Sequence, residues 1–419
     1  MAALPANGRI LQRRYGWHIW HQFFNCFKAN HRSGNPQLKS LGSFIQQVWQ
    51  AGCPLPVKFF TMKVVYFLGA GASKNFGYPL TGDIMPEILT GLINKDLFMH
   101  SAANRSKITE EQNRLLEYFY TLYPGLRKVD IQKEKQRVPN ITEVLSMVDH
   151  CCFYHIPPHP ALSDNNLDDF RLLLNRAIGE LMLLYEEKPY TADERKLLEN
   201  FIAPIRQERK PDDGLTFITT NYDLVIDNEI QNEMLIDRVD YGTAYRSVFD
   251  SSLSTIPNNP MLKYYKLHGS LNWLRCSLCG HFYINPYGCI VRQAFKDEID
   301  EHNTCVCSDH LRLKTVLVSP SLVRDIRDAN LLQIWRAALE SIRVADKLVF
   351  IGYSLPAEDL AIKSIIMRGL NGRKKMHPID IAVVQYGNAA QNNYLNLFET
   401  NIKYYARGLE EYLQSNAVI

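Results

Sequence analysis

Four short clusters in the sequence carry residue types that can bind a ligand or move a proton. Each follows directly on an apolar run with strand character: Gly69-Ala70-Gly71-Ala72-Ser73, Thr219–Asp223, His268–Ser270 and Gly352–Ser354. In open parallel sheets, ligands bind outside the carboxyl ends of the strands. We therefore expect the four clusters to converge on one crevice.

Asn221 and His268 are the candidate catalytic residues. An asparagine amide donates and accepts hydrogen bonds at once, which suits ribose hydroxyls or a reacting water. The alternative is that Asn221 caps the following helix, although Thr220 or Asp223 could do that instead. The imidazole of His268, with an unperturbed pKa of about 6.5, suits proton transfer near neutrality. A lone histidine is more often structural, but this one ends a strand and Gly269 leaves room beside it.

The first and last clusters are candidates for binding a nucleotide. The apolar, β-branched run Val64–Leu68 stops at the glycines, as a buried strand does where it turns into a helix. Glycines let a ligand approach the backbone, and a helix start offers N–H groups to a phosphate. An ordinary strand-to-helix turn is the alternative, because Gly77 falls later than the full G-x-G-x-x-G pattern requires. The candidate binding residues are Gly69, Ala70, Gly71, Ala72, Ser73, Thr220, Asp223, Gly352, Tyr353 and Ser354.

Two cysteine pairs form a candidate structural zinc site. Cys276-x-x-Cys279 and Cys305-x-Cys307 flank a loop with turn-forming residues, and four thiolates would close a tetrahedron around zinc. The second pair is one residue shorter than the usual spacing, so His310 could replace Cys307, and His281 is another candidate. Unliganded cysteines are the alternative. A disulfide framework is not expected, since no secretory signal is recognised.

The elements around these clusters alternate between strands and helices, which predicts an α/β fold with a Rossmann-like, mostly parallel sheet. The predicted strands are 64–68, 215–219, 261–267, 315–318, 347–351 and 379–385. The region 91–210 has few strand signals and is predicted to be a helical insertion, with helices at 108–123, from 140, at 167–187 and at 191–206. The cysteine-bearing segment 275–312 is predicted to be a small zinc module.

Composition points to a globular protein with more than one module. The chain has 419 residues, of which 46% are hydrophobic and 22% charged. No apolar run is long enough to cross a bilayer, so we expect a cytoplasmic protein without membrane contact. The net charge of +3 does not indicate a nucleic-acid surface.

The basic residues are unevenly distributed. Residues 1–61 contain seven Lys or Arg and no Asp or Glu, which leaves 40 basic against 44 acidic residues in 62–419. We expect 1–61 to be an extension. One interpretation is an upstream segment translated from a mis-set start, because Met62 lies just before the first strand; the alternatives are a docking arm, a targeting segment or a disordered segment. The main domain is then 62–419.

In their order, the motifs resemble the sirtuin superfamily. The series runs from the glycine turn through Thr220-Asn221-Tyr222-Asp223, His268-Gly269 and the paired cysteines to Gly352-Tyr353-Ser354. The resemblance covers about 62–390 and implies a Rossmann-like NAD-binding domain, a zinc module and a helical module. Deacylating sirtuins carry a Pro-Asp-Phe-Arg segment after the glycine turn, where this chain reads Gly77-Tyr78-Pro79-Leu80-Thr81-Gly82-Asp83.

The residues of these motifs are most similar to those of the sirtuin-like effectors of bacterial antiphage systems. That resemblance implies an NAD glycohydrolase in which Asn221 positions the ribose or water, His268 accepts a proton and the glycine turn holds the pyrophosphate. It also implies regulation, by a homo-oligomer, a protein partner or a phage trigger. The alternatives are an NAD-dependent protein deacylase and a non-enzymatic sensor of NAD or ADP-ribose.

Overall fold

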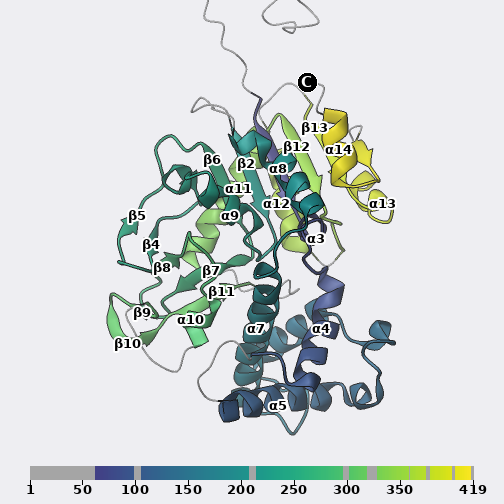
Figure 1. Cartoon of the computed structure of the whole chain (residues 1–419), viewed down its shortest axis with the longest axis vertical. Helices are drawn as coiled ribbons and strands as arrows, with labels where there is room; N and C mark the ends of the chain where they lie inside the picture. Colours follow the sequence, from purple (N-terminus) through teal and green to yellow (C-terminus); the bar gives the residue numbers. More distant parts are fainter. Residues whose placement is uncertain are drawn as a thin grey trace, which may run out of the picture. The chain divides into compact units, whose positions relative to one another are not determined.

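The computed structural model describes residues 62–98, 105–206, 214–295, 302–318, 328–357, 359–373, 378–398 and 402–416. Residues 1–61, and with them the predicted extension, lie outside the described residues. The described residues from Met62 onward form one compact unit (Figure 1). The domain boundaries given above stay predictions.

A parallel sheet of seven strands forms the centre of this unit, which confirms the predicted fold class. Its order is β14-β13-β12-β1-β2-β6-β3, and every neighbouring pair is parallel. The strands are β1 (Val64–Leu68), β2 (Leu215–Thr219), β3 (Val239–Asp240), β6 (Leu262–Lys266), β12 (Lys347–Ile351), β13 (Asp380–Val384) and β14 (Ile402–Tyr405). Their apolar runs reflect burial on both faces, as parallel sheets require.

The strand order places a switch point at β1. β1 pairs with β2 on one side and with β12 on the other, in the registers Leu68 to Thr219 and Leu68 to Ile351. In the sheet, β2 lies on one side of β1 and β12 lies on the other, so the connections that follow β1 and β12 run to opposite sides. Loops that leave adjacent strands in opposite directions open a crevice at their carboxyl ends. β6, which precedes His268, lies parallel beside β2, so all four predicted clusters begin at one edge of the sheet.

Helices pack around the sheet. They are α3 (Ala70–Lys74), α8 (Ala192–Arg206), α9 (Val225–Asn232), α11 (Ala329–Val344), α12 (Leu360–Asn371), α13 (Gln391–Leu395) and α14 (Leu409–Asn416). α8 contacts the sheet through Phe201, whose ring lies 6.1 Å from that of Tyr66 and 5.9 Å from that of Phe217. α8 therefore covers the sheet, although it follows the helical region in sequence.

The helical region contains α4 (Thr81–Asn94), α5 (Arg105–Leu122), α6 (Ile141–Tyr154) and α7 (Asp164–Glu186). Two short 3-10 turns connect α5 to α6, and these four helices pack on one another through buried faces (Figure 1). The predicted start of a helix at Asn140 is confirmed, because its side chain accepts a hydrogen bond from the Thr142 N–H. No helix in the described ranges is long and apolar enough to span a membrane.

A second, smaller sheet adjoins the first, in the order β11-β7-β8-β4-β5. Its strands are β4 (Tyr245–Ser247), β5 (Leu253–Ser254), β7 (Gly269–Arg275), β8 (Phe282–Ile284) and β11 (Lys314–Leu317). α10 (Val291–Phe295) and the hairpin of β9 (Thr304–Cys305) and β10 (Ser308–Arg312) complete this part. The strand predicted at 315–318 exists, but it pairs antiparallel with β7 instead of joining the parallel sheet.

Candidate functional site

Three glycines bring the first and last clusters into backbone contact. A Cβ on Gly69 would lie 2.6 Å from the Tyr353 Cα, and one on Gly71 would lie 2.8 Å from the Gly352 Cα. Gly352 has a φ of +60°, and a Cβ there would lie 2.0 Å from the Ala72 nitrogen. Any side chain at these positions would force the two turns apart. The glycines are therefore needed for the packing of β1 against β12, whether or not they also admit a ligand.

Three backbone N–H groups of the glycine turn already donate hydrogen bonds to carbonyl groups of the protein. Gly69 N–H donates to the Ile351 carbonyl, Gly71 N–H to the Gly352 carbonyl and Ala72 N–H to the Gly69 carbonyl, at 2.9–3.0 Å. α3 is only five residues long, so its dipole is small. The predicted use of this turn by a pyrophosphate thus stays a proposal.

Asn221 is fixed by the glycine turn. Its Nδ2 donates to the Gly69 carbonyl and to the Ser73 Oγ, both at 2.8 Å. The Ser73 hydroxyl in turn donates to the Asp223 Oδ2 at 2.6 Å. Both amide protons of Asn221 are thus committed, and its Oδ1 is the atom left to accept from a ligand. Residues about 150 positions apart in the chain meet here, as the topology predicts.

The alternative that Asn221 caps the following helix does not hold. The residue that precedes α9 is Leu224, and the Asp223 Oδ1 accepts the Val225 N–H at 3.2 Å. Thr220 fastens the loop instead to β1, because its N–H donates to the Leu68 carbonyl at 3.1 Å. Asn221 is therefore held in place by the glycine turn rather than by α9.

Asp223 is a buried carboxylate. Burial raises the pKa of the Asp223 carboxyl, while the Lys266 charge and the Ser73 hydroxyl act in the opposite direction. Lys266 is fully buried, and its Nζ donates to the Asp223 carbonyl at 2.6 Å and to the Asp227 Oδ2 at 2.8 Å. Asp227 also accepts from Tyr264 and Asn272. This charged network fixes the loop after β2 on β6 and β7.

Glu186, at the end of α7, is a site neighbour that the sequence analysis missed. It accepts from the Tyr78 hydroxyl at 2.5 Å, from the Leu224 N–H at 3.4 Å and from the Asn228 amide. Burial raises the pKa of Glu186, and the Asp223 charge adds to that effect, while the hydrogen bonds lower it. The helical region is thus joined to the loops after β1 and β2 by one carboxylate. No spacing pattern marks this residue, because its partners come from two distant segments, around Tyr78 and at the start of α9.

His268 lies in the turn between β6 and β7. Its side chain is buried, and its carbonyl accepts the Val318 N–H at 2.8 Å. The neighbouring Leu267 N–H donates to the Thr219 carbonyl, and the Leu271 N–H to the Tyr222 carbonyl. The loops that carry His268 and Asn221 are therefore hydrogen-bonded neighbours at one sheet edge.

The last cluster is divided between core and surface. The Tyr353 ring packs against Phe67 at 4.9 Å, and its hydroxyl donates to the Asp359 Oδ2 at 2.6 Å. The Tyr353 hydroxyl is thus directed into the protein. Ser354 is exposed.

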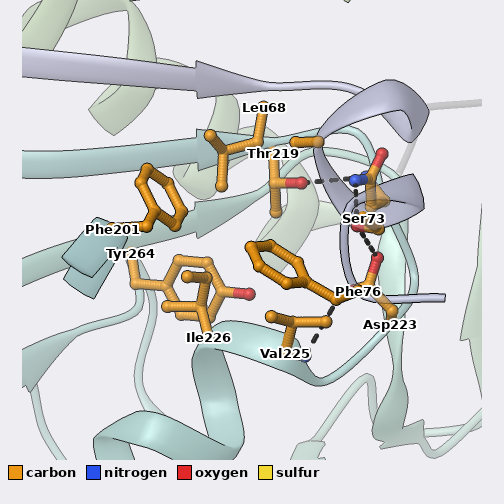
Figure 2. A pocket seen from close by; sticks show the side chains of 11 residues that line it. Leu68, Ser73, Phe76, Phe201, Thr219, Asp223, Val225, Ile226 and Tyr264 are labelled. Atoms are coloured by element: carbon orange, nitrogen blue, oxygen red, sulfur yellow. Dashed lines mark hydrogen bonds between the residues drawn. The ribbon is translucent and has the colours of Figure 1, made fainter. Parts of the chain in front are cut away.

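Asn221 is one of the residues that line a small cavity (Figure 2). Its volume is about 10 Å³, and Phe76, Phe201 and Val225 form much of its wall. Ser73 and Asp223 lie on its polar side, joined by the hydrogen bond drawn in Figure 2. The cavity has room for about one water molecule next to the polar chain.

The four predicted cysteines come together in space. The Sγ atoms of Cys276, Cys279, Cys305 and Cys307 all lie within 4.8 Å of one another. The Sγ atoms of Cys276 and Cys307 lie 3.6 Å apart, and those of Cys279 and Cys305 lie 3.4 Å apart. Four sulfurs at about 2.3 Å from a zinc ion lie about 3.8 Å apart, so the donor set and its size fit zinc.

The environment of Cys276 favours the thiolate that zinc requires. Burial acts to raise its pKa, but the Cys279 and Leu278 N–H groups and the neighbouring thiols lower it to about 7. His281 lies at the edge of the cluster, with its Nδ1 3.8 Å from the Cys305 Sγ. The alternative ligand His310 has a side chain outside the described part of the structure.

The fold and site define an α/β protein with a Rossmann-like sheet, a hydrogen-bonded set of polar loops at its carboxyl edge and a four-cysteine cluster. Residues 215–405 match a family model described as the SIR2-like domain. This match supports the sirtuin-like superfamily that the motifs predict, and it spans three of the motif clusters and the cysteine pairs. No curated protein that was compared matches the chain.

Solved sirtuin structures are similar over most of the chain but at low identity. A structure described as showing the mechanism and regulation of Sir2 enzymes is 13% identical, with a TM-score of 0.36, and the match covers 84% of this chain and 90% of that one. A Sir2 protein bound to a propionylated peptide is 13% identical, with a TM-score of 0.31, over 84% and 91%.

Proposed function

We propose that this protein is an NAD glycohydrolase that releases nicotinamide and ADP-ribose from NAD. The SIR2-like match supports an NAD-related enzymatic function. The observation that carries the proposal is the chain Asp223–Ser73–Asn221, which fixes an asparagine amide at the switch point of the sheet. Such a rigid polar group suits the positioning of a ribose or a water.

The chemistry needs little more than positioning and a proton acceptor. The bond between nicotinamide and ribose breaks with a cationic leaving group that becomes neutral, so no general acid is required. Water adds to the ribose carbon, and the proton it loses passes to His268 and then to solvent. The Asn221 Oδ1 accepts from that water or from a ribose hydroxyl, and its committed Nδ2 prevents the amide from turning.

The segment after the glycine turn favours hydrolysis over deacylation. The Phe and Arg of the Pro-Asp-Phe-Arg segment that deacylating sirtuins carry are absent from Gly77–Asp83, where α4 begins at Thr81. Tyr78 is buried and bonded to Glu186. We propose in addition that the four cysteines hold a structural zinc ion. We also propose that the protein is a cytoplasmic defence enzyme regulated by a homo-oligomer, a protein partner or a phage trigger. Such regulation is needed because unregulated NAD hydrolysis would harm the cell that makes the enzyme.

The test is product analysis with matched variants. The protein is incubated with NAD, alone and with extract from infected cells, and the products are separated. We expect nicotinamide and ADP-ribose in equal amounts, and a loss of about 100-fold or more in Asn221→Ala and His268→Ala. Asn232→Ala and His150→Ala, which alter exposed side chains elsewhere, should retain full activity.

Two results would overturn this proposal. Turnover equal to wild type in both Asn221→Ala and His268→Ala would exclude the mechanism. Acetyl-ADP-ribose formed only when an acylated peptide is supplied would assign the protein to the deacylases.

A further inference from the structure

A second cavity lies in the helical region, away from the four clusters. Its volume is about 470 Å³, and small-molecule sites commonly measure about 300–1,000 Å³. It is lined by residues from α4 and α7, from the turn after α4 and from the connection between α5 and α6. None of its lining residues belongs to a predicted motif.

One part of this cavity is apolar and the other is polar. Pro86 of α4, Leu97 and the α7 residues Leu181 and Leu184 supply apolar surface. Thr90 and Gln132 lie on the polar side, joined by a hydrogen bond of 3.2 Å. Such a lining suits a ligand with an apolar body and one polar head.

The charges on the polar side favour a cation. Glu87 and Asp96 both line the cavity, and the carboxyl end of α4 lies there, where the Gly91 carbonyl accepts the Asp96 and Leu97 N–H groups. Lys135 is the one cation among the described lining residues, and its Nζ lies 3.8 Å from the Asp83 carboxylate. The lining is therefore net acidic.

We propose that the cavity between α4 and α7 binds a small amphipathic organic cation, with one ammonium or amidinium group on an apolar body. The apolar body lies against Leu181 and Leu184. The cationic head lies between the carboxylates of Glu87 and Asp96. A neutral ligand of the same shape gains only the apolar part of this binding.

Two consecutive residues at the end of α7, Tyr185 and Glu186, link the cavity to the polar loops at the sheet edge. The Tyr185 hydroxyl donates to the Glu87 Oε2 at 2.5 Å, so a bound cation shares the Glu87 carboxylate with Tyr185 and changes the strength of that hydrogen bond. The next residue, Glu186, holds Tyr78 and Leu224 at the edge of the sheet. Occupancy of the cavity therefore changes the support of the loops that carry Ser73 and Asp223. Control of turnover by this route rests on the proposed NAD hydrolysis, whereas binding itself does not.

Calorimetric titration with a matched pair of probes tests the binding. We expect cyclohexylmethylamine to bind one site per chain saturably, and cyclohexylmethanol, its neutral counterpart, to bind at least about 10-fold more weakly. Leu184→Trp fills the cavity and should abolish binding. Leu172→Trp, at an exposed leucine of the same helix, should retain it.

Asp96→Asn tests the charge without a risk to folding, because Asp96 is exposed. We expect this variant to bind the amine about 10-fold more weakly. No saturable binding of the amine to wild type, equal affinity for both probes, or unchanged binding in Leu184→Trp and Asp96→Asn would overturn the proposal.

Amide hydrogen exchange tests the link between the cavity and the polar loops at the sheet edge independently of NAD turnover. The amine should change exchange in the peptides that contain Tyr78 and Leu224, and should leave the β9–β10 hairpin unchanged. Binding without this change would overturn the link and leave the site in place. Binding by a protein that does not hydrolyse NAD would contradict only the proposed function.

Discussion

The polar loops at the sheet edge and the cysteine cluster are assembled in opposite ways. The hydrogen bond from Ser73 to Asp223 joins residues 150 positions apart, whereas Cys276 and Cys307 are separated by 31 positions. These loops come together only when the parallel sheet has formed, because they follow β1, β2, β6 and β12. The cluster needs only the β7–β8 and β9–β10 connections.

This difference predicts different consequences of damage. Changes at the sheet edge should affect the packing of the whole domain or its turnover. Changes at the cysteines should act on the small module and leave the polar chain Asp223–Ser73–Asn221 in place. The predictions below test that separation, from the largest effect to the smallest.

Gly352→Ala should have the largest effect. Its Cβ would lie 2.0 Å from the Ala72 nitrogen on a backbone with φ of +60°, and neither turn can yield without disturbing β1 or β12. We expect a loss of about 3 kcal/mol or more in the free energy of unfolding, measured by urea denaturation. Gly82→Ala is the control, because nothing lies within 4 Å of its Cβ. A Gly352→Ala protein as stable as the control would contradict the packing of the two turns.

Cys276→Ser should remove the metal and weaken the small module. We expect elemental analysis to find about one zinc per wild-type chain and almost none in the variant, with a loss of about 2–4 kcal/mol in stability. Cys152→Ser, in α6, should retain the zinc. Wild-type protein purified without chelators and found free of metal would show that the cysteines are unliganded.

Ser73→Ala should reduce turnover more than stability. It removes the hydroxyl that accepts from Asn221 and donates to Asp223, and leaves the buried Asp223 Oδ2 without that donor. We expect a loss of about 1–2 kcal/mol in stability and a decrease in kcat with a smaller change in KM. The control is Ser146→Ala, whose hydroxyl bonds to the Thr142 carbonyl within α6. Equal kcat in the two variants would remove Ser73 from the site.

Glu186→Gln should have the smallest effect, which is a change in how the free energy of unfolding depends on pH. Because the folded-state pKa of Glu186 is raised, the folded protein retains a proton that the unfolded chain has released. Wild-type stability therefore falls as pH rises from the unfolded value of about 4.3 through the raised folded value. The glutamine variant lacks this contribution, so wild type should lose stability relative to it across that window. Parallel pH profiles from urea unfolding would contradict the raised pKa.

Much of the sheet edge could be predicted from sequence, because apolar runs that end in glycine or polar clusters define parallel strands and their carboxyl ends. The cysteine cluster followed from spacing. β7 was not predicted, because a strand that begins at Gly269 directly after the β6 turn gives no separate signal and belongs to another sheet. The roles of Tyr353 and Glu186 depend on tertiary contacts with Asp359 and Tyr78, which no local pattern reports.

The most direct test of the account is a crystal structure of the His268→Ala protein soaked with NAD. The account predicts NAD at the carboxyl edge of the seven-stranded sheet, with the pyrophosphate beside the turn Gly69–Ser73 and the nicotinamide ribose within hydrogen-bonding distance of the Asn221 Oδ1. NAD bound elsewhere on the chain, or bound with Asn221 out of reach of the ribose, would contradict it.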